Sequence, residues 1–289
     1  MPELDAIIIG SGPAGLEAAL NLKIRKKNFL LFGSESLSPK LEAAPRIDNY
    51  LGFPGITGME LKSKMAAHLK AMDIKITPER VSAVYPMGKS FSVATNKNIY
   101  ESRVVILACG VLENSELPGE KAFLGRGVGY CATCDAPLYK GKTVAILGYG
   151  GDAVEEANFV SEIAAKVFFF PLGKKMKTAL SGGIEIIDGE PAAITGSLKA
   201  ETLTIDNGRE LKADGFFILR DSIAPQSLIP GLETEHGYVS ADSGMRTNIE
   251  GCFAAGDCTG KPHQYMRAAG QGQTAALSAV KYLDRIKES

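Results

Sequence analysis

The sequence predicts an α/β protein made of two three-layer, nucleotide-binding-type domains, the second inserted in the first. Two β-α-β patterns predict this, one at the start of the chain and one beginning near residue 143. The segment after residue 237 then returns to a strand, a turn and a long amphipathic helix. We therefore expect a terminal domain over residues 1–112 and 238–289, and an inserted domain over residues 113–237.

The first β-α-β pattern opens with an apolar run, Leu4–Gly10, that is typical of a buried parallel strand. Pro13–Asn21 follows with apolar residues at helical spacing, and Phe29–Phe32 is a second strand. Between strand and helix the chain reads Gly10-Ser11-Gly12-Pro13-Ala14-Gly15, which fits G-x-G-x-x-G. We therefore interpret this segment as the first half of a Rossmann-like domain.

Each glycine of this turn has a physical reason if a dinucleotide binds there. Gly10 permits the tight turn, Gly12 lets main-chain N–H groups approach a pyrophosphate, and Gly15 allows close packing of helix on strand. Glu35 follows the second strand, where its carboxylate can accept hydrogen bonds from ribose hydroxyls. A glycine-rich turn without a ligand is the alternative, but strand, helix and acid stand in the expected order.

The inserted domain repeats this pattern. Thr143–Gly148 is predicted as a strand, Asp152–Ala165 as a helix and Val167–Phe170 as the next strand. Gly148–Ala153 has the form G-x-G-x-x-A, although this domain can keep its fold without keeping a ligand. Further predicted strands are Arg103–Gly110 in the terminal domain and a β-meander over Ile184–Ile187, Leu203–Asp206 and Phe216–Leu219, with a hairpin turn at Asp206-Asn207-Gly208.

The C-terminal segment supplies the remaining parts of the terminal domain. Gly251–Asp257 reads as a strand and turn, and Gly270–Ile286 as a long amphipathic helix. Gly256-Asp257 can place a second acid at the nucleotide. A surface Gly-Asp turn is the alternative.

Composition excludes several function classes. The net charge is −1, with no long run of either sign, so we expect no nucleic-acid or membrane partner. The chain shows neither a signal peptide nor an apolar run of membrane-spanning length, so we expect a cytoplasmic protein. Five cysteines in a chain of 289 residues favour thiols that react or pack over a secreted disulfide framework.

Cys131-Ala132-Thr133-Cys134-Asp135 is the candidate reactive motif. Two intervening residues let the sulfurs meet across one turn, and a helix start lowers the pKa of a thiol. Asp135 is placed to give or take a proton during exchange. A zinc half-site is the alternative, but it needs two more ligands, and we expect no metal because the chain has three histidines and no second C-x-x-C. We interpret Cys109, Cys252 and Cys258 as packed small residues.

With these motifs in order, the chain resembles the low-molecular-weight thioredoxin reductases. The resemblance covers nearly the whole chain, and the Cys-Ala-Thr-Cys-Asp block is its most specific part. The matching segments are Gly10–Gly15, Ile47–Tyr50, Pro54-Gly55, Ala108–Gly110, Gly127–Asp135, Val154–Ala157, Phe253–Asp257 and the helix Ala269–Leu283.

The resemblance implies a homodimer in which FAD lies extended on the terminal domain. It also implies that Cys134 is nearest the flavin, that Cys131 attacks the disulfide of thioredoxin, and that the inserted domain rotates to expose the pair. The residues implied at FAD are Gly10, Ser11, Gly12, Pro13, Ala14, Gly15, Glu35, Asn49, Val81, Ala108, Gly110, Gly256 and Asp257, with Gln264 and Tyr265 beside the isoalloxazine ring.

Departures from the family pattern concern the electron donor. NADPH-using members carry His-Arg-Arg after the strand that follows the second glycine turn, and such arginines grip the 2′-phosphate. Here that strand ends in Phe169–Gly173, and Lys174, Lys175 and Lys177 only partly replace the arginines. Further on, Leu219-Arg220-Asp221-Ser222 stands where the family normally has a glycine near the nicotinamide approach.

This pattern resembles the ferredoxin-dependent flavin thioredoxin reductases, in which reduced ferredoxin supplies the electrons. We expect ferredoxin and thioredoxin as partners on these grounds. One alternative is an NADPH-dependent thioredoxin reductase with an atypical nucleotide site. The other is a flavin redox sensor with little turnover.

Overall fold

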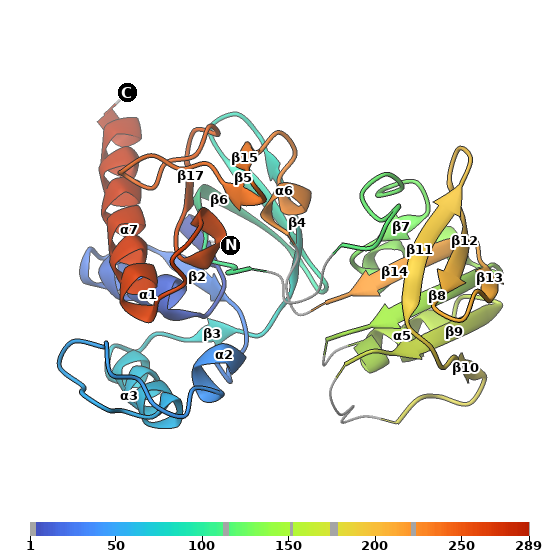
Figure 1. Cartoon of the computed structure of the whole chain (residues 1–289). Helices are drawn as coiled ribbons and strands as arrows, with labels where there is room; N and C mark the ends of the chain where they lie inside the picture. Colours follow the sequence, from blue (N-terminus) through green and yellow to red (C-terminus); the bar gives the residue numbers. More distant parts are fainter. Residues whose placement is uncertain (1–3, 112–115, 151–152, 174–178, 221–223, 289) are drawn as a thin grey trace. The chain divides into compact units, whose positions relative to one another are not determined.

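The structure is a computed structural model that describes residues 4–111, 116–150, 153–173, 179–220 and 224–288 (Figure 1). The chain divides into two compact units, and each is described by itself. Unit 1 comprises Met1–Val111 and Ala224–Ser289, and unit 2 comprises Leu112–Ile223. The first boundary expected from the sequence, at 112/113, lies outside the described residues. The second, expected at 237/238, instead falls before Ala224.

Local contacts explain why residues 224–237 belong to unit 1. Helix α6 (Pro225–Leu228) packs against strand β4 (Val81–Pro86) of that unit, and Leu228 is buried. The Asn248 side chain donates to the carbonyl of Gly231 at 2.9 Å and accepts from the N–H of Glu233 at 3.0 Å. Strand β15 (Thr234–Glu235) then pairs with β16 (Tyr238–Val239). The contact of α6 with β4 links residues far apart in sequence, which single-sequence patterns do not reveal.

Unit 1 is built on a seven-stranded sheet in which β1 lies between β2 and β6, and both neighbours run parallel to it. The register pairs Ile8 with Leu31 on one side and with Ile106 on the other, so the apolar runs form a continuous core layer. Antiparallel β5 and β4 extend the sheet from β6, and β17 pairs parallel with β6. The strands are β1 (Leu4–Ile9), β2 (Phe29–Phe32), β3 (Ile76–Thr77), β4 (Val81–Pro86), β5 (Phe91–Thr95), β6 (Ile99–Leu107) and β17 (Cys252–Ala254).

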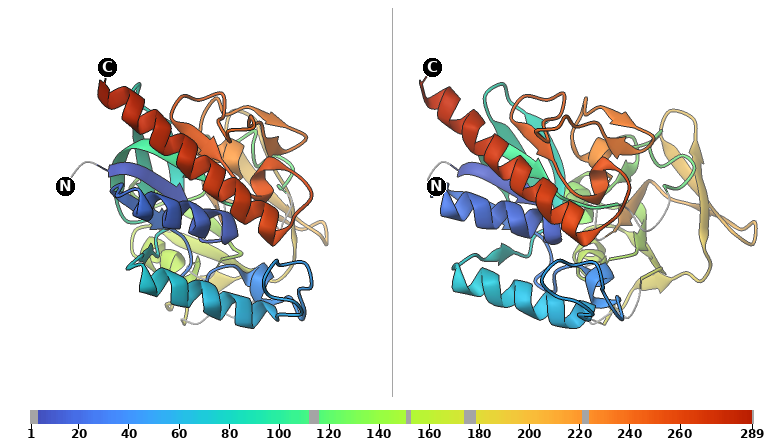
Figure 2. Two further views of the ribbon diagram at one scale, coloured as in Figure 1. Left: turned by 90° about the vertical axis from the view of Figure 1, so that its left-hand side faces the viewer. Right: turned by 60° about the vertical axis from the view of Figure 1, so that its left-hand side comes forward.

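Helices α1 (Pro13–Ile24) and α7 (Tyr265–Glu288) lie side by side over this sheet, as both views of Figure 2 show. Small residues allow the close approach, because a Cβ at Gly272 would overlap the carbonyl of Ala14. Ala18, Ala275 and Ala279 are fully buried in the same core. Helix α3 (Gly58–Ala71) follows α2 (Pro39–Glu42) and begins with a Thr57–Glu60 capping box.

Unit 2 has a second parallel sheet, in the order β10-β9-β8-β14-β7. Helix α5 packs on it through Val154, Ala157 and Val160, which share a core with Ile146 and Phe169. The α/β class expected from the sequence is thus confirmed in both units. The elements are β7 (Val128–Gly129), α4 (Ala132–Asp135), η1 (Ala136–Tyr139), β8 (Thr143–Gly148), α5 (Ala153–Ser161), β9 (Lys166–Pro171), β10 (Ile184–Ile186) and β14 (Gly215–Leu219).

The predicted β-meander of unit 2 is only partly right. A three-stranded antiparallel sheet exists, but its strands are β11 (Pro191–Gly196), β12 (Ala200–Ile205) and β13 (Glu210–Lys212). The hairpin turn at residues 206–208 is confirmed, with Gly208 at a positive φ of 78°. Ile184–Ile186 and Phe216–Leu219 instead join the parallel sheet. Short apolar runs of this kind do not specify the direction of their partner strand.

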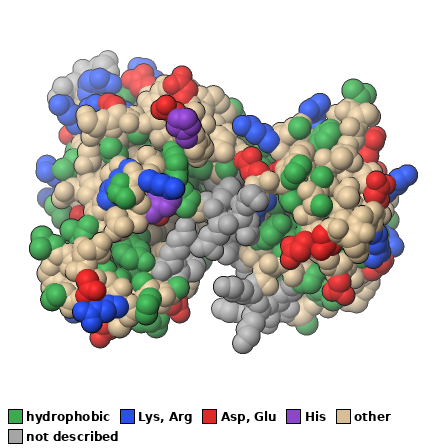
Figure 3. All heavy atoms as spheres, viewed as in Figure 1, with side chains coloured by type: hydrophobic (Ala, Val, Ile, Leu, Met, Phe, Trp, Pro, Cys, Tyr) green, Lys and Arg blue, Asp and Glu red, His purple; other side chains and the backbone are tan. Residues whose placement is uncertain are grey.

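The surface matches the near-neutral composition. On the face seen in Figure 3, acidic and basic side chains are interspersed. Within the described ranges, no helix combines the length and the apolar character needed to cross a bilayer.

Candidate active site

The first glycine turn lies between the end of β1 and the start of α1. Gly10 has φ +116°, and its N–H donates to the carbonyl of Phe32 at 2.8 Å. A Cβ at Gly15 would overlap the carbonyl of Gly10, so only glycine lets the helix start this close to the strand. A Cβ at Gly12, by contrast, would meet no atom within 4 Å.

The space at Gly12 fits a bound pyrophosphate. Gly12 is the N-cap of α1 and makes no side-chain cap, and Pro13 opens the helix. Among the described residues, no main-chain carbonyl accepts from the N–H groups of Ser11 or Gly12. Helix N-terminal N–H groups attract anions, and this turn leaves both the N–H groups and the room for one.

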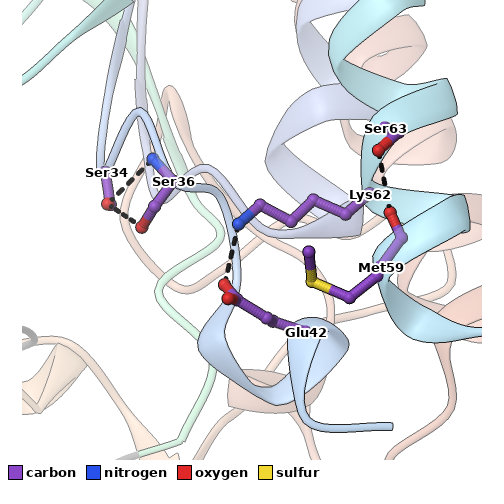
Figure 4. Close-up of polar contacts among 6 residues, drawn as sticks. All are labelled: Ser34, Ser36, Glu42, Met59, Lys62 and Ser63. Atoms are coloured by element: carbon purple, nitrogen blue, oxygen red, sulfur yellow. Dashed lines mark hydrogen bonds and ion pairs between the residues drawn. The ribbon is translucent and has the colours of Figure 1, made fainter. Parts of the chain in front are cut away.

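A second turn places Glu35 next to this cradle. The hydroxyl of Ser11 donates to the carbonyl of Ser34 at 2.9 Å, which ties the end of β2 to the glycine turn. The Ser34 hydroxyl accepts from the N–H of Ser36 at 3.2 Å and lies 2.7 Å from the Ser36 hydroxyl (Figure 4). Glu35, between the two serines, is exposed. The predicted ribose acid is therefore held in a defined turn with its carboxylate in solvent.

Figure 4 also shows the polar contacts of helices α2 and α3. Lys62 of α3 reaches Glu42 of α2 with Nζ–Oε2 at 2.7 Å, and the Ser63 hydroxyl donates to the carbonyl of Met59 at 3.0 Å. The Lys62 side chain is mostly buried, whereas Glu42 is half-exposed. This ion pair fixes α2 and α3, which flank the loop that contains Asn49.

Asn49 and Gln264 meet although they are far apart in the sequence. The Asn49 amide donates to Gln264 Oε1 at 2.6 Å. Tyr265 follows at the start of α7 and packs against the cluster of Leu41, Ile47 and Ile56. Burial raises the pKa of Tyr265, and the nearby Asp257 carboxylate raises it further. Asn49, Asp257, Gln264 and Tyr265 therefore form one neighbourhood.

Asp257 is positioned by a tight junction with α1 and α7. Gly256 has φ +84°, and a Cβ there would lie 2.9 Å from the Ala14 Cβ. The N–H of Gly256 donates to Gln271 Oε1 at 3.0 Å, and Arg267 donates to the carbonyl of Gly260 at 2.6 Å. Neither Gln271 nor Arg267 was predicted, because their partners, which are main-chain atoms and the Thr259 hydroxyl, form no sequence motif.

The remaining predicted cofactor residues stand at strand ends of the same unit. The N–H of Ala108 donates to the carbonyl of Ile9 at 2.8 Å, so the end of β6 lies against the glycine turn. Gly110 follows with φ +67°. Val81 begins β4 with a buried side chain, and in the described part of the chain no hydrogen bond joins it to the other predicted residues. Of the predicted set, Glu35, Ala108 and Gly256 lie beside the turn, next to the contacts Ser34–Ser11, Ala108–Ile9 and Gly256–Ala14.

Cys131 and Cys134 form a disulfide in unit 2, with Cα atoms 5.3 Å apart. Cys131 is the N-cap of α4, and its sulfur accepts from the N–H of Cys134 at 3.2 Å and lies 3.4 Å from the Thr133 hydroxyl. The predicted helix start at the motif is thus confirmed. Cys131 is buried and Cys134 is exposed.

Asp135 ends α4 and is half-buried. Its Oδ2 would lie 2.9 Å from a Cβ built at Gly129, so the carboxyl packs against the β7 backbone. Burial raises the pKa of Asp135 above the ordinary value of an aspartate. The same carboxylate adds to the raised pKa of Tyr139, whose main cause is burial. A carboxyl that keeps its proton more readily suits proton transfer to a thiolate.

A buried carboxylate beside the disulfide was not predicted. Glu156 of α5 is 3% exposed, and its Oε2 accepts from the N–H groups of Ala132 at 2.8 Å and Thr133 at 3.4 Å. The sequence held a signal, because Glu156 shares the apolar helical face of Ala153 and Val160.

The second glycine turn differs from the first in its hydrogen bonds. The N–H groups of Tyr149 and Gly150 both donate to the carbonyl of Leu219, at 2.9 and 2.8 Å. These residues correspond to Ser11 and Gly12 of the first turn. In unit 2 the two described donors that correspond to those of Ser11 and Gly12 are therefore already used by the protein.

Arg220 also lies at this turn. Its guanidinium binds Glu120 through two contacts, at 2.6 and 2.9 Å, and both side chains are buried. The guanidinium carbon lies 5.1 Å from the centre of the Tyr149 ring. Lys174, Lys175 and Lys177 lie outside the described residues.

The three other cysteines are not all equivalent. Cys252 and Cys258 are buried, as predicted, but Cys109 is partly exposed. Burial raises the pKa of Cys252 to about 12. A hydrogen bond with Cys109 and burial raise the pKa of Cys258 well above its ordinary value. No group of three or more His, Cys, Asp or Glu suited to a metal occurs among the described residues.

Comparisons with known proteins agree with this geometry. The model of the pyridine nucleotide-disulphide oxidoreductase family matches residues 4–272. A thioredoxin reductase from Bacillus subtilis is 30% identical over 99% of this chain and 96% of its own.

Solved structures of related proteins are similar to this chain in both sequence and fold. Two crystal structures of a ferredoxin-flavin thioredoxin reductase from Clostridium acetobutylicum are 52% and 50% identical in sequence, with TM-scores of 0.90 and 0.92. The first covers 100% of both chains and the second 99% of both. The chain therefore belongs to the pyridine nucleotide-disulphide oxidoreductase family, and within it to the thioredoxin reductases, which are FAD flavoproteins.

Proposed function

We propose that this protein reduces thioredoxin with electrons from reduced ferredoxin, through FAD and the Cys131–Cys134 disulfide. Support comes from the disulfide in unit 2, the anion cradle in unit 1 and the similarity to the Clostridium ferredoxin-flavin enzyme. Bound FAD supplies a centre that accepts electrons one or two at a time, which suits a one-electron donor and a two-electron disulfide.

We propose that unit 1 holds the FAD. The N–H groups at the first turn would bind the pyrophosphate, and Glu35 the ribose. Asn49, Gln264 and Tyr265 would face the ring system. The proposed set is Gly10, Ser11, Gly12, Pro13, Ala14, Gly15, Glu35, Asn49, Val81, Ala108, Gly110, Gly256, Asp257, Gln264 and Tyr265.

Our choice of ferredoxin as the electron donor rests on a difference between the two glycine turns. A dinucleotide needs main-chain N–H groups aimed at its pyrophosphate. Ser11 and Gly12 are open for this, but Tyr149 and Gly150 donate to Leu219. The buried Arg220–Glu120 pair and the Tyr149 ring also occupy this end of the second sheet. We therefore propose that unit 2 binds no pyridine nucleotide and that the electrons come from ferredoxin.

The chain's own thiols complete the transfer. Two electrons and two protons open the Cys131–Cys134 bond to two thiols. One thiolate then attacks the disulfide of thioredoxin and forms a mixed disulfide, and the second cysteine resolves it, releasing reduced thioredoxin and re-forming the pair. The Cys134 N–H and the Thr133 hydroxyl stabilise a thiolate at Cys131, and Asp135 supplies or takes the proton.

The donor is tested by mixing the purified yellow protein anaerobically with NADPH, with NADH and with chemically reduced ferredoxin, and following the flavin absorbance. We expect bleaching by ferredoxin alone, followed by reduction of thioredoxin. Rapid bleaching by NADPH would instead support the alternative of an NADPH-dependent enzyme with an atypical nucleotide site. Flavin reduction that leaves the disulfide closed would support the redox sensor.

We also propose a cytoplasmic homodimer, on the family resemblance. Light scattering of the FAD-bound protein tests the dimer, and a mass of one chain across the working concentration range would contradict it.

A further inference from the structure

A buried carboxylate lies directly under the redox motif. Glu156 projects from α5 on the same face as Ala153, Ala157 and Val160, which belong to the core of unit 2. The neighbouring Glu155 is exposed. A buried carboxylate is costly unless hydrogen bonds compensate it, so its partners indicate its role.

The partners of Glu156 are the two residues between the cysteines. Its Oε2 accepts from the N–H of Ala132 at 2.8 Å and from that of Thr133 at 3.4 Å. Main-chain N–H groups at this position stabilise a thiolate in redox motifs that start a helix. Here a carboxylate has taken two of them. A thiolate at Cys131 keeps the N–H of Cys134 and the Thr133 hydroxyl.

We propose that Glu156 is a positioning residue that holds the Ala132-Thr133 turn and places a negative charge beside the dithiol, so that it disfavours the thiolate of Cys131. The proposal rests on the proposed function, since it concerns the same disulfide. A carboxylate next to a developing thiolate repels it and competes for its hydrogen-bond donors. After reduction, the pair is therefore held mainly as two neutral thiols until thioredoxin docks.

Other titratable groups near the disulfide must be distinguished from Glu156. They are Tyr130 before the motif, Asp135 at the end of α4, Tyr139 in η1, Glu155 on α5, and the Arg220–Glu120 pair, whose arginine interacts with Tyr130. Glu155 provides a matched control, because it precedes Glu156 on the same helix but faces solvent, where its charge is screened.

The test measures the Cys131 thiol itself. FAD-bound full-length protein carrying Cys134→Ser is reduced, and the rate of iodoacetamide alkylation of the Cys131 peptide is followed by mass spectrometry across pH. Peptide analysis separates Cys131 from Cys109, Cys252 and Cys258. The comparison is with Glu156→Gln, which keeps the size and an acceptor oxygen, and with Glu155→Gln.

We expect Glu156→Gln to lower the pKa of the Cys131 thiol by about one pH unit. Alkylation below that pKa becomes about three- to fourfold faster, because the thiolate gains about tenfold in population and loses part of its nucleophilicity. Glu155→Gln leaves the profile unchanged. Superimposable profiles for Glu156→Gln and the Cys134→Ser parent would overturn the proposal, as would an equal shift in Glu155→Gln.

The measurement uses neither thioredoxin nor ferredoxin. If the protein reduces no thioredoxin but the shift occurs, the proposed function fails and the role of Glu156 stands. If Glu156→Gln does not fold, infrared difference spectra of the unchanged protein on disulfide reduction at alkaline pH give a second measurement. Disulfide reduction should shift a carboxylate band, and a shift that persists in Asp135→Asn cannot come from Asp135 and supports the proposal. The absence of such a shift overturns it.

Discussion

At the disulfide, the two sulfur atoms have different surroundings. Cys131 is buried, caps α4 and accepts a hydrogen bond, whereas Cys134 is exposed. The family resemblance assigns the attack on thioredoxin to Cys131. That assignment requires Cys131 to become accessible during turnover. Trapping the mixed disulfide with thioredoxin distinguishes it from the reverse assignment, in which Cys134 attacks.

Trapping uses the single cysteine variants. We expect Cys134→Ser to accumulate a mixed disulfide between Cys131 and thioredoxin, because no second thiol resolves it. Cys131→Ser should trap much less, and each variant should lose thioredoxin reductase activity. Non-reducing gels and mass spectrometry give the result, with Cys252→Ala as a control that keeps full activity. Trapping by Cys131→Ser in place of Cys134→Ser would reverse the two roles.

Asp135 leads to a pH-dependent prediction. Burial raises its pKa in the folded protein, so in the range above the pKa of an unfolded aspartate the folded state binds more protons than the unfolded state. The contribution of Asp135 to stability therefore falls as pH rises through the folded pKa. The melting temperature of Asp135→Asn, relative to that of the parent, should therefore increase as pH rises from about 4 to 7. A pH-independent difference in melting temperature would contradict the raised pKa.

At the scale of elements, the same β-strand–turn–helix unit occurs twice, but the main-chain N–H groups of the two turns are used differently. The first turn leaves the donors of Ser11 and Gly12 open, and the second gives those of Tyr149 and Gly150 to Leu219. The motif G-x-G-x-x-[GA] predicts the fold of both turns correctly. It does not report which donors the protein itself consumes, since that depends on a strand more than sixty residues further along the chain.

The first turn gives a test in two substitutions. Gly12→Ala adds a methyl group into open space at φ −78°, so the fold is kept, but the methyl group stands where a pyrophosphate would lie. We expect FAD affinity to fall about ten- to a hundredfold, with the melting temperature of the FAD-free protein unchanged. Gly15→Ala should instead unfold the unit, because its Cβ overlaps the Gly10 carbonyl. Unchanged FAD affinity in Gly12→Ala, by fluorescence titration, would place the cofactor elsewhere.

The individual helices and strands differ in how well the sequence predicts them. Apolar runs ending in glycine locate β1, β2 and β8 to within a residue, because burial on both faces leaves a continuous apolar pattern. The Asn49–Gln264 contact and the boundary at Ala224 depend on packing between distant segments, which no local pattern encodes. The role of Glu156 cannot be predicted from the sequence, because the N–H groups that its carboxylate binds belong to a distant segment of the chain.

At the scale of the whole molecule, the two units have separate cores. One contains the residues of α1, α7, β1 and β6, and the other those of α5, β8 and β9. Unit 2 also contains the buried Arg220–Glu120 pair. Damage to one core should therefore affect that unit first.

Arg220→Ala tests this independence. Removing the arginine leaves Glu120 as a buried charge, which should cost unit 2 about 3–5 kcal/mol of unfolding free energy. Lys166→Ala, which breaks a half-exposed pair with Glu185, should cost at most about 1 kcal/mol. During denaturation, hydrogen exchange of unit 2 peptides reports the loss of unit 2, and flavin fluorescence reports the release of FAD from unit 1. A fall in both midpoints together in Arg220→Ala would mean that the units unfold as one.

Unit 1 is assembled from both ends of the chain, and this has a consequence during protein synthesis. β17 pairs with β6, and α7 packs on α1, so the unit cannot close until its last helix has left the ribosome. Unit 2 is complete earlier and is free to fold while translation continues. The nascent protein therefore acquires its cysteine motif before it can retain a flavin, and a riboflavin-starved cell would accumulate chains whose dithiol is folded but has no source of electrons.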